Sequence, residues 1–436
     1  MLAQQLNAAF EMIYRSFNQY GHQIASDEER HPEYTTQLLR ALGRPDQALR
    51  NVMVTGSKGK GSTALLIARL LRARGSSTGL FTSPHLLDSL ERIRVNGLMI
   101  SETEFVKVFS HIEPVLRRLL EDQLPVGQYL GPVGIFAVMA AWFYRASGAE
   151  WAVYETGRGA LYDDVACISH PYAVITTVLP EHVRELGPTL AKIAWHKAGV
   201  ISPDTRVVVL GSRESVLQQA VDARCRQLGI KPQLLWADQR VKIDARRIND
   251  HGTQFDMRFH DGRFWQDMTM RQLGPIADNL ALAVAVVEEV AGPLSESQVR
   301  EAASSARWPG RGEVLSQSPF LLLDAGVRPE SLNPWLKALP VFDRVLLSVP
   351  DGKDRGGMVN LAQQHGKEII LTACSNPRLR YQFDRAARQT KVTVISDVRR
   401  ALDMTLSDLP PDARVFLCGT ISFVADVYRY LGRSVL

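Results

Sequence analysis

Residues 52–63 read VMVTGSKGKGST, an apolar run that passes without a break into a glycine-rich stretch. The apolar run predicts a buried strand, and the glycines predict a tight turn that leads directly into a helix. Such a turn lets backbone N–H groups surround a phosphate at the positive end of the helix. Lys60 is then placed to reach β- and γ-phosphates, and Ser62 or Thr63 to contact magnesium or phosphate oxygens. Because Gly61 follows Lys60, the strict GxxxxGK[ST] pattern is not met, and a glycine-rich turn that holds no ligand stays an alternative.

Outward from this turn, short β-branched runs such as WAVYE and YAVITTVL alternate with longer amphipathic segments. This alternation predicts an α/β fold with a parallel sheet covered by helices. The polar stretch 292–312, which contains Gly and Pro, predicts a hinge, and strand-like runs restart beyond it. We therefore expect two domains, residues 1–297 and residues 298–436, the second being a smaller α/β domain.

Composition and charge exclude several classes of protein. With 45% hydrophobic and 22% charged residues, the chain has ordinary globular composition. The formal charge of +5 comes from 51 basic and 46 acidic residues spread along the chain, so we expect no nucleic-acid partner. Its four cysteines form no CxxC or Cys/His cluster, which argues against a zinc site or a disulfide framework. The longest apolar run, residues 133–144, is too short to span a bilayer, and the expectation is a cytoplasmic protein without membrane contact.

Glu155 directly follows the apolar run of residues 151–154. A carboxylate at the carboxyl end of a parallel strand faces the crevice where ligands of α/β sheets bind. Magnesium that bridges ATP phosphates is usually held by one or two such carboxylates. Glu155 is therefore a candidate magnesium ligand, and a solvated strand end is the alternative.

Several blocks of sequence together point to a known family. In chain order they are GSKGKGST, FTSPHLLDSLERIRVNGLMISETEF, IAWHKAGVI, WPGRGEVL, LLLDAGVRPESL, DGKDRGG and FLCGTISFV. This order resembles that of the folylpolyglutamate/dihydrofolate synthases, a branch of the Mur ligases, through most of the chain. The resemblance implies a P-loop-containing, Mur ligase-like ATP-binding domain with a parallel sheet, followed by a smaller C-terminal α/β domain.

The resemblance also assigns metal ligands. Ser83, Glu155 and His182 match protein ligands of magnesium, and Ser62 joins them from the glycine-rich stretch. Lys197 matches a lysine that carbon dioxide converts to a carbamate, which helps to hold a second Mg²⁺. Carbamylation needs the free amine, so the site must lower the lysine pKa from its usual value of about 10.4. Taken alone, His182 could be a surface-loop histidine and Lys197 an ordinary helix-face lysine.

For ATP, the resemblance implies contacts from both predicted domains. Arg311 matches an arginine that contacts nucleotide phosphates, and Asp324 matches an aspartate near the adenosine. The alternatives are that Arg311 caps the linker and that Asp324 starts a turn. The full set predicted to bind the nucleotide is Gly56, Ser57, Lys58, Gly59, Lys60, Gly61, Ser62, Thr63, Asn279, Arg311 and Asp324.

Four blocks depart from the family pattern, and in one of them Glu181-His182 stands where the family has DH. Residues 324–329 read DAGVRP where the family has DGAHNP, so Val327 and Arg328 replace a histidine and an asparagine. Residues 157–166 read GRGALYDDVA in place of GLGGRLDATN, and residues 132–138 read PVGIFAV in place of TxFExxT. Because the last two blocks belong to the substrate side, we expect an altered acceptor with retained phosphate chemistry.

The sequence therefore predicts an ATP-dependent, ADP-forming ligase that works through an acyl phosphate, with Lys60, Lys197, His182 and Arg311 as catalytic residues. It is expected to add an amino acid such as glutamate to a small-molecule carboxylate, as a monomer or weak homodimer with two Mg²⁺ ions. One alternative is a true dihydrofolate/folylpolyglutamate synthase. The other is a non-catalytic nucleotide-binding partner protein, for which the replacements at Val327 and Arg328 are the motive.

Overall fold

The computed structural model describes residues 1–21, 29–383 and 392–435, and the chain divides into two compact units. Unit 1 comprises Met1–Lys242, Arg258–Arg263 and Asn279–Ala302; unit 2 comprises Ile243–Met257, Phe264–Asp278 and the chain from Ala303 onward. The last change of unit, after Ala302, falls inside the polar stretch 292–312, which also contains helix α10 (Glu296–Ser305). The division of the chain into residues 1–297 and 298–436 stays a prediction.

Unit 1 is built on an eight-stranded sheet in the order β4-β3-β2-β5-β1-β6-β7-β8. Strands β2, β5, β1, β6, β7 and β8 are parallel to their neighbours. Beyond β2, strands β3 and β4 pair antiparallel and form one edge of the sheet. The strand bounds are β1 Arg50–Thr55, β2 Thr78–Phe81, β3 Ile93–Val95, β4 Leu98–Met99, β5 Trp151–Glu155, β6 Tyr172–Ile175, β7 Val207–Leu210 and β8 Gln233–Trp236.

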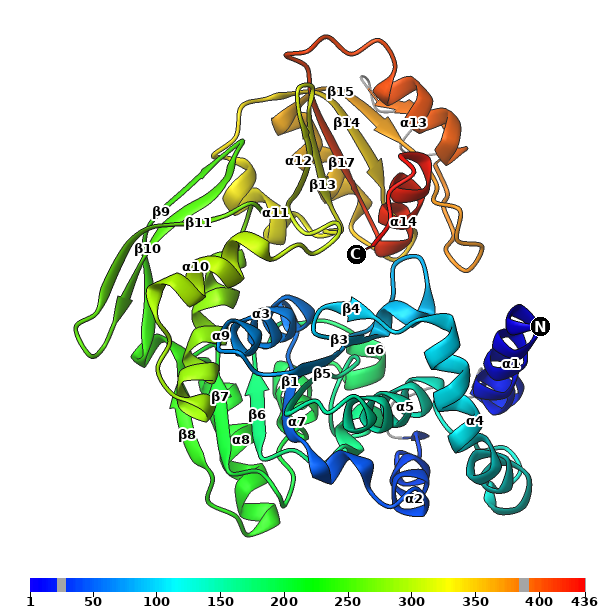
Figure 1. Ribbon diagram of the computed structural model, residues 1–436. Coiled ribbons are helices and arrows are strands. Elements are labelled where there is room, and N and C mark those ends of the chain that lie inside the picture. The colour runs from blue at the N-terminus through cyan, green and yellow to red at the C-terminus, as the bar shows by residue number, and fades with distance from the viewer. Residues whose placement is uncertain (22–28, 384–391, 436) are drawn as a thin grey trace. The chain divides into compact units, whose positions relative to one another are not determined.

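The central strands are almost completely buried because both faces of the sheet are covered. Every residue of β5 is buried, and so is every residue of β1 after Arg50. Helix α3 packs on β1, β2 and β5, and α5 packs on β2 and β3, with the two helices on either side of the sheet (Figure 1). A parallel sheet covered on both faces needs such uninterrupted apolar strands, so the runs VMV and WAVY determine where the sheet forms.

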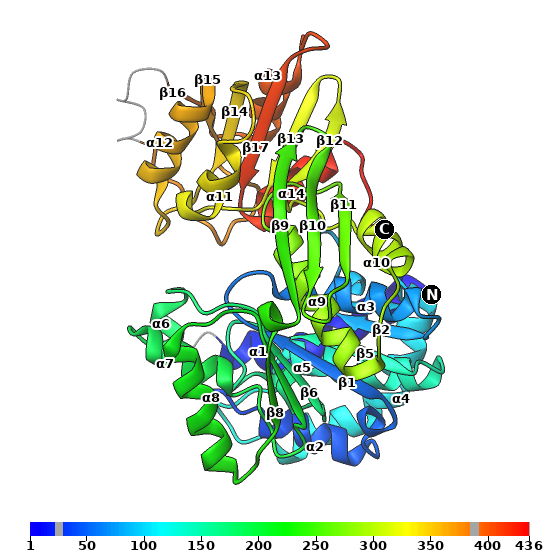
Figure 2. The ribbon, with the colours of Figure 1, turned by 90° about the vertical axis from the view of Figure 1, so that its left-hand side faces the viewer.

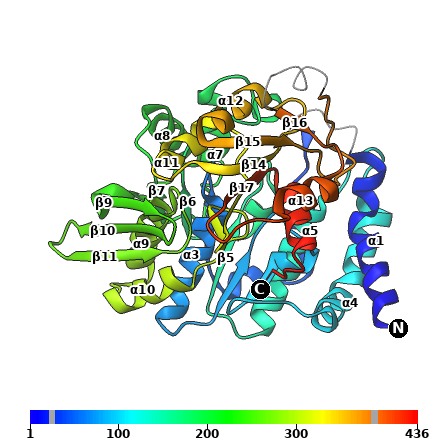
Figure 3. The ribbon, with the colours of Figure 1, turned by 90° about the horizontal axis from the view of Figure 1, so that it is seen from above.

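In the described ranges, fifteen helical segments surround this sheet, and each belongs to unit 1 or is shared between the two units. Helices α1 and α4 lie side by side in both Figure 1 and Figure 3, and the Phe10 and Phe105 rings meet there with centroids 5.3 Å apart. Ser101 and Glu104 form a reciprocal capping box at the start of α4, which stops this helix from extending backwards. The helix bounds are α1 Leu2–Tyr20, α2 Glu33–Ala41, η3 Pro45–Ala48, α3 Lys60–Ala73, η4 Ser89–Arg92, α4 Glu102–Arg118, η5 Leu119–Gln123, α5 Pro132–Ala146, η6 Asp164–Cys167, α6 Val183–Leu186, α7 Leu190–Ala198, α8 Ser215–Leu228, η7 Ala237–Gln239, α9 Ile276–Ala291 and α10 Glu296–Ser305.

A separate three-stranded sheet has the order β11-β10-β9, and its strands run alongside one another in Figure 2. Its strands are β9 Val241–Asn249, β10 Gly252–Phe259 and β11 Phe264–Met270. Most residues of β9 are not buried, whereas β10 buries Phe255 and Met257. The sequence pattern did not single out this small sheet.

Unit 2 contains a six-stranded sheet in the order β12-β13-β17-β14-β15-β16. The predicted strand runs FLLLD, RVLLS, EIIL, VTV and VFLCG all lie in it, and only the β12–β13 pair is antiparallel. The bounds are β12 Glu313–Gln317, β13 Phe320–Asp324, β14 Phe342–Ser348, β15 Gly366–Leu371, β16 Val392–Val394, β17 Arg414–Gly419, α11 Pro329–Leu336, α12 Arg355–His365, α13 Val398–Leu406 and α14 Ile421–Tyr430. The predicted fold class, a parallel α/β sheet with a second, smaller α/β unit, is confirmed.

No helix within the described ranges is both long enough and apolar enough to cross a lipid bilayer.

Replacing Tyr154 with Phe is expected to leave the protein at least as stable as the wild type. The Tyr154 hydroxyl is buried, and it has no hydrogen-bond partner in the described parts of the chain. An unpaired buried hydroxyl costs about 1–3 kcal/mol, so its removal relieves part of that cost. Thermal unfolding followed by circular dichroism measures the effect. Tyr154→Ala, which leaves a cavity, should instead lower the free energy of unfolding by about 3–5 kcal/mol, and a similar loss in Tyr154→Phe would contradict the assignment.

Candidate active site

Four neighbouring parallel strands, β2, β5, β1 and β6, end at one edge of the unit 1 sheet. Their register pairs Phe81 with Tyr154, Val54 with Glu155, and Thr55 with Ile175. The segments that follow these strands therefore emerge together, which is where α/β sheets bind ligands. They carry most of the side chains that the sequence predicted for the site.

The glycine-rich loop after β1 requires glycine at two positions. Gly56 has φ +136°, and a Cβ there would lie 2.0 Å from Thr176 Oγ1. Gly59 has φ +80°, and a Cβ there would lie 2.3 Å from Asn279 Oδ1. Neither position accepts a side chain without displacing its neighbour. The close approach of Asn279 also places this predicted nucleotide residue against the loop.

The same loop is fastened to the segment after β6. The Ser57 backbone N–H donates to Thr177 O at 2.8 Å, and the Lys58 N–H donates to Thr177 Oγ1 at 3.1 Å. In the other direction, Thr176 Oγ1 donates to Lys58 O at 2.6 Å. These bonds hold the loop at the N-terminus of α3, where the helix dipole and unsatisfied N–H groups favour an anion.

Lys60 begins α3, and its Nζ donates to Gly56 O at 2.8 Å, so the ammonium lies over the loop. Ser62 and Thr63, in the first turn of the helix, are both buried. The Thr63 hydroxyl is buried without a hydrogen-bond partner in the ranges that the structure describes. The loop, the lysine and these hydroxyls thus lie together where residues 52–63 predict a phosphate site, and phosphate binding by them stays a prediction.

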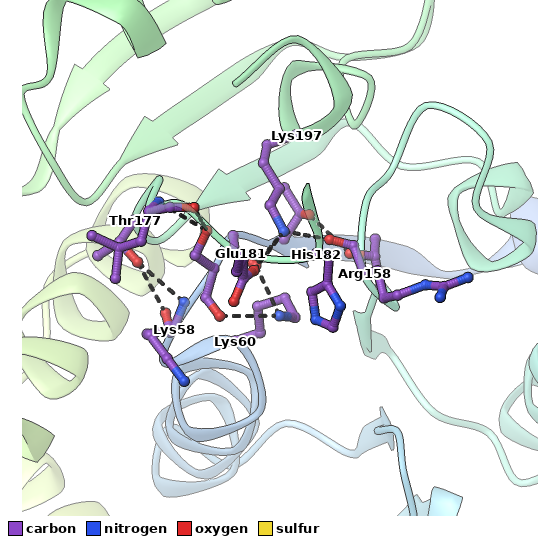
Figure 4. Close-up of polar contacts among 12 residues, drawn as sticks. Lys58, Lys60, Arg158, Thr177, Glu181, His182 and Lys197 are labelled. Atoms are coloured by element: carbon purple, nitrogen blue, oxygen red, sulfur yellow. Dashed lines mark hydrogen bonds and ion pairs between the residues drawn. The ribbon is translucent and has the colours of Figure 1, made fainter. Parts of the chain in front are cut away.

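Lys197 lies in the last turn of α7 and is completely buried. Its Nζ donates to Gly56 O at 2.9 Å, to Arg158 O, and to Glu181 Oε1 at 3.1 Å (Figure 4). Burial, reinforced by the positive charge of Lys60 and opposed by Glu181, lowers the pKa of Lys197 to about 8. The amine is therefore much easier to deprotonate than that of a surface lysine.

Glu155 and Ser83 lie together at the ends of β5 and β2. The Ser83 N–H donates to Glu155 Oε2 at 3.1 Å, and Glu155 is buried. The segment beyond Ser83 is held by Glu91, whose carboxylate accepts the backbone N–H groups of Leu86, Leu87 and Asp88, each at 2.8 Å. The TSPHLLDSLER block thus forms a fixed loop that presents Ser83 beside Glu155.

His182 precedes α6 with φ +48°, in the left-handed region. Its side chain is 41% exposed, and Nδ1 lies 3.9 Å from Glu185 Oε2. Partial burial lowers the pKa of His182 below its usual value, so the imidazole is neutral at neutral pH and has a nitrogen lone pair for a metal. In Figure 4 the ring lies between Lys60 and Arg158.

These donors fit magnesium in their chemistry. Glu155, Ser83 and His182 offer a carboxylate, a hydroxyl and a neutral imidazole, which suit a hard cation once phosphate oxygens and water complete the octahedron. Within the described residues, no three His, Cys, Asp or Glu side chains are grouped closely enough to hold a metal by themselves. A metal here would therefore depend on the nucleotide for part of its coordination, and the ligand assignments stay predictions.

Arg311 and Asp324 belong to unit 2 and are described within it. Asp324 ends β13 and is buried; its carboxylate accepts the N–H of Gly312 at 2.7 Å and the N–H of Gly326 at 2.6 Å. Arg311 is exposed beside Gly312, so the Asp324 bond sets the position of the arginine backbone. The replaced residues Val327 and Arg328 lead into α11. The contacts of Arg311 and Asp324 with a nucleotide stay predictions.

Comparisons with known proteins follow this geometry. No protein-family profile matches the chain. The folylpolyglutamate synthase of Lacticaseibacillus casei is 30% identical over 408 residues, which are 90% of this chain and 92% of that enzyme. The chain belongs to the folylpolyglutamate synthase family. A Mycobacterium tuberculosis folylpolyglutamate synthase structure with ADP and AMPPCP matches with a TM-score of 0.84 at 25% identity, covering 99% of this chain and 100% of that one.

A third match is a solved complex of folylpolyglutamate synthase with AMPPCP and folate. Its TM-score is 0.78 at 25% identity, and the match covers 97% of this chain and 99% of that chain. Membership of the folylpolyglutamate synthase family confirms the predicted enzyme class. The protein is an ATP-dependent, ADP-forming ligase with the two-domain, Mur ligase-like fold.

Three residues of the site were not predicted as such from the sequence. Thr176 and Thr177 anchor the glycine-rich loop, and Glu181 pairs with Lys197. Two consecutive threonines directly after the run YAVI could have signalled hydroxyls at a strand end. Nothing in the spacing indicated that Glu181 would reach Lys197, because α6 and the turns around it determine that approach.

Gly59→Ala is expected to lower both thermal stability and ATP affinity, whereas Gly75→Ala should have the smaller effect on stability and none on ATP. The two glycines flank the same helix, α3, and both have positive φ, +80° and +92°. Of the two, Gly59 meets a neighbour, Asn279, whereas no atom of the described residues lies within 4 Å of a Cβ at Gly75. Both alanine variants therefore have a backbone strain of about 1–2 kcal/mol, and only Gly59→Ala also brings a Cβ against Asn279. Melting curves and calorimetric titration with ATP would refute this account if the two variants behaved alike.

Proposed function

We propose that the protein is a folylpolyglutamate synthase that joins L-glutamate to a carboxylate of a reduced folate. The observation that carries the proposal is the match to the Lacticaseibacillus casei enzyme, which extends over 90% of the chain and includes the phosphate loop and the Lys197 helix. The solved folate complex of a folylpolyglutamate synthase supports the same substrate class. These comparisons favour the folate substrate over the altered acceptor that the substrate-side replacements led us to expect.

The reaction follows from the charges at the sheet edge. ATP phosphates bind at the N-terminus of α3, where Lys60 turns from Gly56 O to the terminal phosphoryl group. A carboxylate oxygen of the acceptor attacks the γ-phosphorus, the bond to the β-phosphate oxygen breaks, and ADP leaves. The glutamate amine then attacks the acyl carbon of the acyl phosphate, and inorganic phosphate departs with loss of the amine proton. Since phosphoryl transfer depends mainly on positioning and charge neutralisation, Lys60 and the loop N–H groups contribute most directly.

Magnesium would be held by Glu155, Ser83, His182 and modified Lys197, and it supplies neutralisation of the phosphate charge when bound. Ser62, in the buried first turn of α3, is proposed to contact the same region.

Carbamylation of Lys197 is part of this proposal. The step joins Nζ to the carbon of carbon dioxide and releases a proton, so it consumes the neutral amine. The low pKa of Lys197, about 8, supports it. The resulting carbamate keeps a single N–H, so it can donate at most one of the three hydrogen bonds to Gly56 O, Arg158 O and Glu181, and its negative charge requires the Glu181 carboxylate to find another cation or a proton.

A ligase with another acceptor is the second candidate function, and one replacement favours it. Leu161 stands where the family motif GLGGRLDATN has its arginine, so this position of the substrate-side loop carries no cation. The non-catalytic alternative is not retained, because the enzyme class follows from the family.

The deciding experiment supplies the purified protein with Mg-ATP, L-glutamate and either tetrahydrofolate or dihydropteroate. ADP release and a product heavier by one glutamyl residue are expected, and Lys60→Ala should lower turnover on the order of a thousandfold. Lys107→Ala, which removes an exposed lysine from α4, serves as the matched control and should retain wild-type turnover. ATP binding without product on either acceptor would reject the folate function and favour the second candidate.

Lys197→Ala is expected to lower turnover about 100-fold or more, because the site loses the anion that carbamylation would supply. Added acetate or propionate should restore part of that activity by entering the space left by the side chain. Sodium chloride at equal ionic strength is the control, and it should restore nothing. Full activity of the variant without any added carboxylate would remove Lys197 from the mechanism.

A further inference from the structure

Arg158 lies at the candidate active site although neither the phosphate loop nor the metal ligands require it. It follows Glu155 by three positions, on the segment that leaves β5. In the motif that reads GLGGRLDATN in the family, this position holds leucine, and the arginine position holds Leu161 here. The chain therefore carries its cation at a different place on the same substrate-side loop.

The backbone around Arg158 is firmly fixed. Its carbonyl accepts a hydrogen bond from buried Lys197, which also binds Gly56 O. The N–H of the preceding Gly157 donates to Asp163 Oδ2 at 3.0 Å, and Asp163 is buried. Unmodified Lys197 thus ties Arg158 to the phosphate loop, and the Gly157–Asp163 bond, which does not involve Lys197, also holds this segment if the lysine is carbamylated.

The Arg158 side chain, in contrast, faces outward. It is 41% exposed, and Figure 4 shows the guanidinium extending away from Lys197, past His182. Nη1 donates to Glu185 Oε1 at 3.1 Å, and Glu185 is itself 27% exposed. A solvent-accessible ion pair of this kind contributes little to stability, so exchange of one carboxylate for another is inexpensive. A guanidinium can bind an incoming carboxylate through two parallel N–H bonds.

Two cations beside Arg158, Lys60 and Lys197, are directed toward the phosphate loop. Lys60 and Lys197 both point to Gly56 O, and Lys197 is also paired with Glu181. The Arg158 guanidinium, which is paired with Glu185 and partly exposed, lies instead on the side of the site marked by His182 (Figure 4).

We propose that Arg158 binds a substrate carboxylate, and that Glu185 holds its guanidinium until the substrate carboxylate replaces it. The inference rests on the proposed function, because a folate acceptor with a terminal glutamate has two carboxylates, of which one is activated and the other needs a partner. Dihydropteroate has a single carboxylate, which is consumed in the reaction. L-Glutamate is the other source of the same chemistry.

The test compares the wild type with Arg158→Leu, which restores the residue of the family motif, and with Arg158→Lys. Arg184→Leu, which removes an exposed cation from neighbouring α6, is the matched control. Arg158→Leu should raise KM for tetrahydrofolate roughly 10- to 100-fold, with a smaller change in kcat and in the KM for ATP, and Arg158→Lys should recover part of the loss. KM for dihydropteroate should change no more than in Arg184→Leu.

The KM values for the two substrates show which of them supplies the carboxylate that Arg158 binds. A rise in KM for L-glutamate alone assigns Arg158 to the amino-acid carboxylate, and a rise for tetrahydrofolate alone assigns it to the acceptor. KM values within twofold of the wild type for both substrates would overturn the proposal. Glu185→Gln, which weakens the competing carboxylate, should lower the affected KM, and an increase equal to that of Arg158→Leu would show that the ion pair only supports the loop.

Calorimetric titration of tetrahydrofolate and of L-glutamate in the presence of Mg-ADP gives a measurement independent of turnover. Binding that weakens in Arg158→Leu supports the role of Arg158 even if the wild type forms no glutamylated product, which would reject only the proposed function. Equal affinities in the wild type and the variant, or binding of neither substrate by the wild type, would overturn the inference while leaving the activity assay to judge the function.

Discussion

The buried ammonium of Lys197 contacts three segments that lie far apart in the chain. It donates to Gly56 at the start of the phosphate loop, to Arg158 on the segment after β5, and to Glu181 on the segment after β6. A lysine without solvent must find acceptors for all its protons, and these three supply them. The relative positions of three loops are therefore tied to one side chain that is also the predicted site of carbamylation. A chemical change at that nitrogen is therefore expected to affect contacts of all three loops.

The sequence was most informative where a local pattern and a buried environment agree. The runs VMV and WAVY predicted central strands because both faces of a parallel sheet are covered, and Gly56 and Gly59 predicted a turn that their positive φ angles now explain. The small sheet of β9, β10 and β11 was not foreseen, since β9 carries charged residues and is largely unburied, so it lacks the apolar run that identifies a strand.

Within the candidate site, the sequence predicted the positions of single residues better than the contacts between residues distant in the chain. Lys60 could be placed from the loop sequence, because it begins the helix that the glycines introduce. The Glu181–Lys197 pair could not, since it depends on how α6 and α7 pack after the sheet has formed. At Val327 and Arg328 the sequence suggested a change that the local backbone does not show. Asp324 still accepts two backbone hydrogen bonds, so the turn after β13 is held without the family histidine and asparagine.

The hydrogen bonds of Glu91 affect which substitutions the loop after Ser83 can tolerate. Its carboxylate accepts three consecutive backbone N–H groups, from Leu86 to Asp88, so the path of the loop after Ser83 depends on main-chain atoms and on one acid. Side chains that point outward from such a loop can be exchanged without altering the course of the chain. The arrangement separates two kinds of heritable variation: substitutions around the loop can modify what the enzyme accepts, while Ser83 keeps its place beside Glu155.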